Sequence, residues 1–263
     1  MEVVSLEAWM VITVAGVFGL LLGSFLNVCT LRWPTDQSVV HPPSHCPACE
    51  ASIQWYDNIP VLSYLILGGR CRACRALISP QYPMVELATG LIWAGSFLQH
   101  GLSVEGARGA VFLTILRGIA VSDARFYIIP DQFSLGGAAI GLALAPLPGG
   151  LTLLQSFLGA AVGFGLLWLV ATAGTWLFKK DAMGGGDLKM MAMVGAFLGI
   201  PGVFLTLFLG ALLGSVIFGP ISWKTGKLVP FGIFLAVGGA VAYGWGDLLI
   251  GWYMERFLDF SPA

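Results

Sequence analysis

Charged side chains are scarce in this sequence of 263 residues: they make up 10% of the chain, whereas 57% of its residues are hydrophobic. A soluble domain carries about a quarter charged residues. The chain therefore has too little polar surface to face water, and we expect membrane lipid to surround most of it. A basic stripe with interleaved aromatic residues is also missing, which excludes nucleic acid as a partner.

The N-terminal segment has no basic residue before Arg32, although it carries Glu2 and Glu7. A cleavable secretory signal begins with a basic region, so we interpret the apolar run from Trp9 to Val28 as a first transmembrane helix. By the positive-inside rule, the N-terminus then lies outside the cytoplasm and Arg32 lies inside it.

Apolar runs recur along the rest of the chain and indicate an all-α polytopic membrane protein of about eight transmembrane helices. The runs cover residues 8–28, 84–100, 107–123, 131–147, 152–178, 187–200, 202–219 and 230–254. With eight crossings, most basic residues fall in or beside cytoplasmic connections: Arg32, Arg70, Arg72, Arg75, Arg125, Lys179, Lys180, Lys189, Lys224 and Lys227. Only Arg108 and Arg256 fall on the other side, so both termini are predicted outside the cytoplasm. The 36 glycines suit close packing of these helices.

One long polar insertion, residues 29–83, contains two Cys-x-x-Cys pairs: Cys46 with Cys49, and Cys71 with Cys74. Four thiolates at this spacing are typical of a tetrahedral zinc site, and four protein ligands leave no open position for a substrate. We therefore predict structural zinc in a small cytoplasmic loop domain. A redox dithiol or metal-free packing are the alternatives, and disulfides are disfavoured in a reducing cytoplasm.

Two aspartates occur at the edges of predicted spans. Asp123 ends the third span and Asp187 opens the sixth, directly after Gly184-Gly185-Gly186. The topology places both at the cytoplasmic edge, so their carboxylates can meet although they are far apart in sequence. A facing pair of carboxylates supplies one acid and one base, which is aspartic-protease chemistry. Taken singly, each is also explained as an interfacial residue, and Asp187 as a helix N-cap.

Six motifs, in this order, resemble those of bacterial type IV prepilin peptidases. They are Gly23-Ser24-Phe25-Leu26-Asn27-Val28, the paired Cys-x-x-Cys motifs, Tyr82-Pro83-Met84-Val85-Glu86, Asp123 with Ile129-Pro130-Asp131, Gly184-x-Gly186-Asp187-x-Lys189, and Val229-Pro230-Phe231-Gly232. The resemblance runs from about residue 23 to residue 235. One departure is Ile233, where the family usually has a second proline.

The resemblance implies a bacterial inner-membrane enzyme, so the side on which the charge distribution places both termini is the periplasm. Such an enzyme removes the leader from type IV prepilins and type II secretion pseudopilins on the cytoplasmic side, and then N-methylates the new N-terminus with S-adenosylmethionine. Carried over to this chain, the catalytic aspartates are Asp123 and Asp187, and the zinc ligands are the four cysteines. Glu86 is a weak candidate for the cofactor site. The implied domains are a first helix (1–28), the zinc loop (29–83) and a seven-helix peptidase domain (84–263).

Two other classes of protein fit the raw composition. An ion-coupled transporter with a zinc-ribbon regulatory loop would use Asp123 and Asp187 as proton or cation sites, but such carriers place these groups near mid-membrane and often contain internal repeats. A non-catalytic scaffold of a pilus machine would not need the Gly-x-Gly-Asp sequence.

Overall fold

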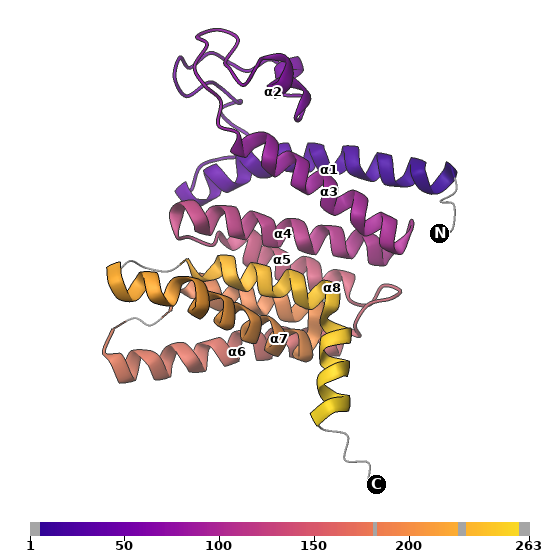
Figure 1. Ribbon diagram of the computed structural model, residues 1–263, viewed down its shortest axis with the longest axis vertical. Helices are drawn as coiled ribbons and strands as arrows, with labels where there is room; N and C mark the ends of the chain where they lie inside the picture. Colours follow the sequence, from indigo (N-terminus) through magenta and orange to yellow (C-terminus); the bar gives the residue numbers. More distant parts are fainter. Residues whose placement is uncertain (1–5, 181–182, 226–229, 258–263) are drawn as a thin grey trace. The chain divides into compact units, whose positions relative to one another are not determined.

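The computed structural model describes residues 6–180, 183–225 and 230–257 (Figure 1), and within these ranges the regular elements are helices. The extended pairing found there is two isolated β-bridges, His45–Ser52 and Arg70–Leu77. The prediction of an all-α fold is thereby confirmed. The α-helices are α1 (Leu6–Arg32), α2 (Leu62–Ile66), α3 (Gln81–His100), α4 (Val104–Phe126), α5 (Asp131–Leu144), α6 (Leu153–Phe178), α7 (Gly185–Thr225) and α8 (Phe231–Phe257).

Four segments among the described residues are long and apolar enough to cross a membrane. They are Leu6–Thr35, Leu153–Leu177, Gly185–Phe218 and Phe231–Arg256. Protein covers little of their apolar surface: Trp176 on α6 is 82% exposed and Leu248 on α8 is 71% exposed. Hydrocarbon covers such surface in a membrane protein, which agrees with the predicted membrane location. The helices α3, α4 and α5 fall on the other predicted spans.

Helix α7 reverses direction at Gly199, whose backbone has φ 67° and ψ −172°. A Cβ built on Gly163 of α6 would contact the Met191 carbonyl and would lie 3.3 Å from Val203 Cγ2. Met191 and Val203 would lie about 18 Å apart in a straight helix. The two halves of α7 therefore fold back on each other, and they correspond to the two predicted spans that meet at this glycine.

The chain divides into two compact units, Met1–Thr114 and Ile115–Ala263. In the first, α1 and α3 lie side by side (Figure 1). A Cβ on Gly23 of α1 would lie 2.6 Å from the Cα of Glu86 on α3. Because a larger residue would force the helices apart, the small residue allows the backbones to pack closely, as is common between membrane helices.

The second unit is centred on the first half of α7. Its neighbours approach through glycines: a Cβ on Gly137 of α5 would lie 2.8 Å from Met193 Cγ, and Gly159 of α6 contacts the backbone of Gly195. The second half of α7 packs on α8, where a Cβ on Gly210 would lie 3.0 Å from Leu235 Cδ2. Four side chains of the first half are fully buried: Met190, Met191, Met193 and Val194. The helix that begins beside Asp187 is thus a fixed core element.

Candidate active site

Asp123 lies near the end of α4, and its side chain is buried. Its Oδ2 accepts a hydrogen bond of 3.1 Å from the backbone N–H of Ile233, in the first turn of α8. A Cβ on the preceding Gly232 would lie only 2.9 Å from the same oxygen. The first N–H groups of a helix have no partner within the helix and favour an anion. The glycine thus lets the Asp123 carboxylate lie against the start of α8.

Asp187 lies in the first turn of α7, and its side chain is partly buried. Its own N–H donates to the Gly184 carbonyl at 3.2 Å, which closes a turn at the glycine run. The residue is thus inside the first helical turn and follows the start of the helix at Gly185. Asp187 does not precede the helix as an N-cap residue does.

Ile129, in the connection between α4 and α5, links the surroundings of the two aspartates. Its side chain is buried, and its Cβ would lie 2.9 Å from a Cβ on Gly186. Its Cδ1 would lie 2.8 Å from a Cβ on Gly232. One side chain therefore contacts the residue before Asp187 and the residue that faces Asp123. The two aspartates are close enough for their charges to interact.

An ion pair ties α7 to α5 next to this site. The Nζ atom of Lys189 donates to both carboxylate oxygens of Asp131, at 2.7 and 2.9 Å. Both side chains are partly exposed, so the pair stabilises the fold by at most about 1 kcal/mol. Lys189 follows Asp187 by two residues, and Asp131 follows Ile129 by two. The pair therefore holds together the two segments that carry Asp187 and its neighbour Ile129.

The four predicted zinc ligands come together in the first unit. The sulfur atoms of Cys46, Cys49, Cys71 and Cys74 all lie within 4.8 Å of one another, and Cys46 and Cys74 are 3.8 Å apart. Zinc–sulfur bonds of about 2.3 Å in a tetrahedron put the sulfurs roughly 3.8 Å apart. The cluster therefore has the donor set and the size that zinc requires. Cys29, the fifth cysteine, is buried in α1.

The two cysteine pairs have the same backbone geometry. The Cys46 N–H donates to Ala51 O at 2.9 Å, and the Cys71 N–H donates to Ala76 O at 2.8 Å. Glu50 and Arg75, the residues after each pair, have φ values of 58° and 61°.

Backbone N–H groups also favour the thiolate of one ligand. Those of Cys74 and Ala73 lower the pKa of the Cys71 thiol to about 7. Because the thiolate is the form that binds metal, this local geometry favours a metal site.

Glu86 is buried at the start of α3 and faces protein groups. Its Oε2 accepts the backbone N–H of Val61 at 2.7 Å, and Ser24 on α1 is a second hydrogen-bond partner. Val61 has φ 60°, a left-handed value that costs a β-branched residue about 1–3 kcal/mol. Glu86 therefore holds the cysteine loop in a strained turn against α1 and α3.

Comparisons with known proteins give the family. The Bacterial Peptidase A24 N-terminal domain matches residues 17–100, and the Type IV leader peptidase family matches residues 110–219. A prepilin leader peptidase/N-methyltransferase of Aeromonas hydrophila is 35% identical over 95% of this chain and 96% of its own. The chain belongs to the type IV leader peptidase family.

Two further relatives carry the same description. The protein of Bacillus subtilis is 33% identical, over 92% of this chain and 97% of its own. That of Myxococcus xanthus is 38% identical over 81% of this chain, a match that spans 64% of the relative. No solved structure matches the chain significantly.

Sequence reasoning did not identify the partners of the two aspartates. It noted Pro230-Phe231-Gly232 as a family motif and gave it no role, whereas Gly232 and Ile233 face the Asp123 carboxylate. Val229, the first residue of that motif, lies outside the described residues. The glycine in the first turn of the predicted span 230–254 was the available signal, because a residue without a side chain admits a close neighbour.

Proposed function

We propose that this chain is a membrane-embedded prepilin peptidase that removes leader peptides with Asp123 and Asp187, and that it also N-methylates the new N-terminus. The main supporting observation is that Ile129 contacts the surroundings of two aspartates that are 64 residues apart in sequence and whose charges interact. The names of the relatives point to the same pair of activities.

The two carboxylates divide the chemistry of peptide hydrolysis. Asp123, whose Oδ2 accepts the Ile233 N–H, is the better-stabilised anion, so we assign it the role of general base toward a water molecule. Asp187 then carries the proton that the amide carbonyl or the leaving nitrogen takes up. The pair shares one proton in this working state and passes it back when product leaves.

The orientation of the enzyme in the membrane is inferred from the distribution of its basic residues. We propose that prepilins and pseudopilins are cleaved at the cytoplasmic face of the inner membrane, with both termini of the enzyme in the periplasm. Ten of the thirteen basic residues are assigned to cytoplasmic segments, two to the other side and Arg117 to a span, which supports this orientation. The basic leader of a prepilin would be held on the same side, where both aspartates are expected.

We propose a structural role for zinc in a loop domain of residues 29–83, which follows a first helix of residues 1–28. Cys46, Cys49, Cys71 and Cys74 would hold the ion, and metal binding would supply folding energy that a short polar loop lacks. The peptidase domain would be residues 84–263. S-adenosylmethionine, when bound, supplies the methyl group for the new amine.

The proposed peptidase mechanism is tested by co-expressing a prepilin with the wild type, Asp123→Asn or Asp187→Asn, and following leader removal by gel shift. Asp247→Asn is the matched control, since Asp247 lies exposed on α8. We expect cleavage by the wild type and the control alone. Cleavage by both active-site variants would overturn the two-aspartate mechanism. Mass spectrometry of the mature N-terminus tests methylation, which an unmethylated amine would contradict.

The transporter alternative has no support from the relatives, whose names describe peptidases and methyltransferases. A wild type that cleaves no prepilin in the same experiment would reopen it.

A further inference from the structure

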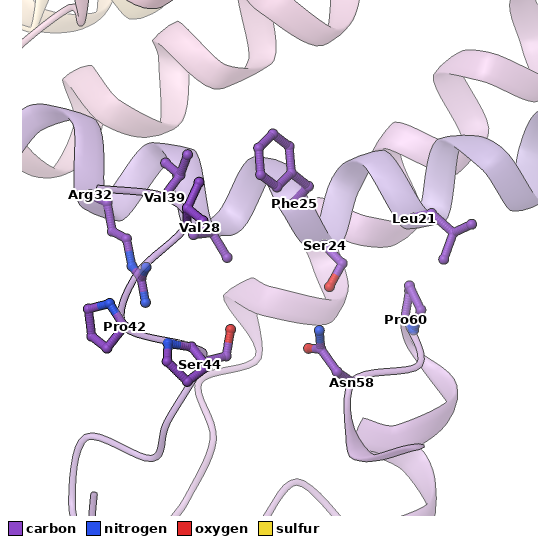
Figure 2. A pocket seen from close by; sticks show the side chains of 12 residues that line it. Leu21, Ser24, Phe25, Val28, Arg32, Val39, Pro42, Ser44, Asn58 and Pro60 are labelled. Carbon is purple, nitrogen blue, oxygen red and sulfur yellow. The ribbon is translucent and has the colours of Figure 1, made fainter. Parts of the chain in front are cut away.

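A cavity of about 340 Å³ lies between α1 and the cysteine loop, within the first unit. Its α1 wall consists of Leu21, Ser24, Phe25, Val28 and Arg32, of which Ser24, Val28 and Arg32 follow each other at intervals of four residues on one face of the helix. The opposite wall comes from the loop, including Ser44, Asn58 and Pro60. Figure 2 shows these side chains from close by.

Polar side chains lie at two places in this cavity. In Figure 2 the Ser24 hydroxyl and the Asn58 amide face each other, with Leu21 and Pro60 beyond them, and the Arg32 guanidinium extends toward the loop at the other end. Ser24 and Arg32 are eight residues apart on α1, or roughly 12 Å along the helix. Val28 lies between them, so the middle of the cavity is apolar. Such a cavity suits an elongated ligand with an anionic group at one end and hydrogen-bonding groups at the other.

Arg32 has donors suited to a carboxylate. One of its nitrogens, Nη1, donates to the Ser38 carbonyl at 2.9 Å, which fixes the loop segment and orients the side chain. A guanidinium has five N–H groups in a planar fork and binds carboxylates in two-pronged fashion. The region around Ser24 and Asn58 offers neutral hydrogen-bonding groups in place of a positive charge, and Ser24 is also a hydrogen-bond partner of the buried Glu86. Hydroxyl and amino groups of a ligand are the natural partners there.

We propose that this cavity is the binding site for S-adenosylmethionine, with the amino-acid carboxylate at Arg32 and the nucleoside at Ser24 and Asn58. The proposal rests on the N-methyltransferase activity proposed above. An amino acid joined to a nucleoside has the required order of groups and a comparable length, and cavities of about 300 Å³ or more suit ligands of this size. Glu86 is then a positioning residue, since its bond to Val61 fixes the turn after Asn58 and Pro60.

A phospholipid is the competing occupant, because the cavity opens beside a membrane helix and Arg32 could bind its phosphate. The lining argues against it. An acyl chain that extends from Arg32 along the cavity would lie against the Ser24 hydroxyl and the Asn58 amide. Burying the Asn58 amide against hydrocarbon is costly, whereas a ligand with polar groups can hydrogen-bond to it.

The site is tested by equilibrium dialysis of radiolabelled S-adenosylmethionine against the full chain in detergent. The second ligand is 5′-methylthioadenosine, which has the nucleoside and lacks the amino-acid carboxylate. We expect Arg32→Gln to weaken S-adenosylmethionine binding by about tenfold or more, through loss of charged hydrogen bonds, and to leave methylthioadenosine binding unchanged. Asn58→Ala should weaken both ligands. The matched control is Arg256→Gln, on the exposed last turn of α8, which should alter neither.

Four outcomes contradict the proposal in different ways. Equal binding of S-adenosylmethionine by Arg32→Gln and Arg256→Gln would remove the site from this cavity. Equal losses of both ligands in Arg32→Gln would overturn the assignment of the carboxylate. Loss of co-purified phospholipid alone from Arg32→Gln would assign the cavity to lipid. A wild type that cleaves prepilin but binds no S-adenosylmethionine would overturn the methyltransferase assignment itself, independently of the cavity.

Discussion

Replacing Gly232 with alanine should slow leader cleavage strongly while leaving the fold intact. The added Cβ would lie 2.9 Å from Asp123 Oδ2 and 2.8 Å from Ile129 Cδ1. Both atoms are ends of side chains, so they can move away without displacing a backbone. The Asp123 carboxylate would then leave the N–H of Ile233, which it now accepts at 3.1 Å. The substitution therefore acts on the position of one carboxylate.

The size of the effect follows from that hydrogen bond. A bond to a charged group contributes about 1.5–3 kcal/mol, which corresponds to a fall of about 10- to 150-fold in cleavage rate if the bond is lost. Stability should not fall, because alanine is favoured over glycine in a helix by up to about 1 kcal/mol. The assay is the initial rate of leader removal from a purified prepilin in detergent, together with the thermal unfolding temperature.

Gly244→Ala is the matched control for Gly232→Ala. Both glycines lie on α8, but a Cβ on Gly244 would meet nothing within 4 Å. We expect this control to cleave at the wild-type rate. A Gly232→Ala variant with wild-type activity would refute the role given to the contact between Asp123 and the start of α8. Equal losses in both variants would instead indicate that α8 tolerates no alanine.

Three further predictions concern the Lys189–Asp131 ion pair, the hydrogen bond from Val61 to Glu86 and the four clustered cysteines. Lys189→Met or Asp131→Asn should lower the cleavage rate by up to about fivefold, the equivalent of about 1 kcal/mol. The double exchange Lys189→Asp/Asp131→Lys should restore most of the lost rate. A double variant that cleaves no faster than the single variants would contradict the role of the ion pair. Glu86→Leu should lower the free energy of unfolding by about 1–3 kcal/mol, because the Val61 N–H loses its acceptor. Glu86→Gln, which keeps an acceptor oxygen, should lower this free energy by less. Equal decreases in the two variants would show that the hydrogen bond does not contribute to stability. Treatment with a chelator, which would remove the proposed zinc, should leave Cys71 as the thiol that reacts first with iodoacetamide near pH 7. Its pKa of about 7 gives it the most thiolate there, and less as the pH falls. The modification rates are followed by mass spectrometry, and equal rates at all four cysteines would contradict this prediction.

Much of the helical architecture was predictable, because long apolar runs in a membrane leave few alternatives to a helix. The runs predicted at 152–178 and 84–100 match α6 (Leu153–Phe178) and α3 (Gln81–His100) closely. The predicted turn at Gly199 is also present, since a glycine with φ 67° followed by Pro201 interrupts a helix. Helix α1 continues past the apolar run to Arg32, because backbone hydrogen bonding continues after hydrophobicity ends.

The cysteine cluster was predictable for a different reason. Two short knuckles each determine their own local geometry, and only the distance between them is left open. The hydrogen bond from the Val61 N–H to Glu86 was not predictable to the same degree. The donor is the backbone N–H of Val61, a group that every residue has, so no sequence pattern marks it.

The environment of the aspartates illustrates the limit of spacing arguments. The topology of the predicted spans gave Asp123 and Asp187 a common depth, but depth leaves the lateral neighbours of a helix open. In the structure, Ile129 lies against both Gly186 and Gly232, and it fits there because neither residue has a side chain. Gly186 precedes Asp187, and Gly232 precedes Ile233, which donates its N–H to Asp123. A substitution of Ile129 would therefore affect the surroundings of both aspartates. The glycines of the two motifs therefore serve as contact surfaces for one side chain.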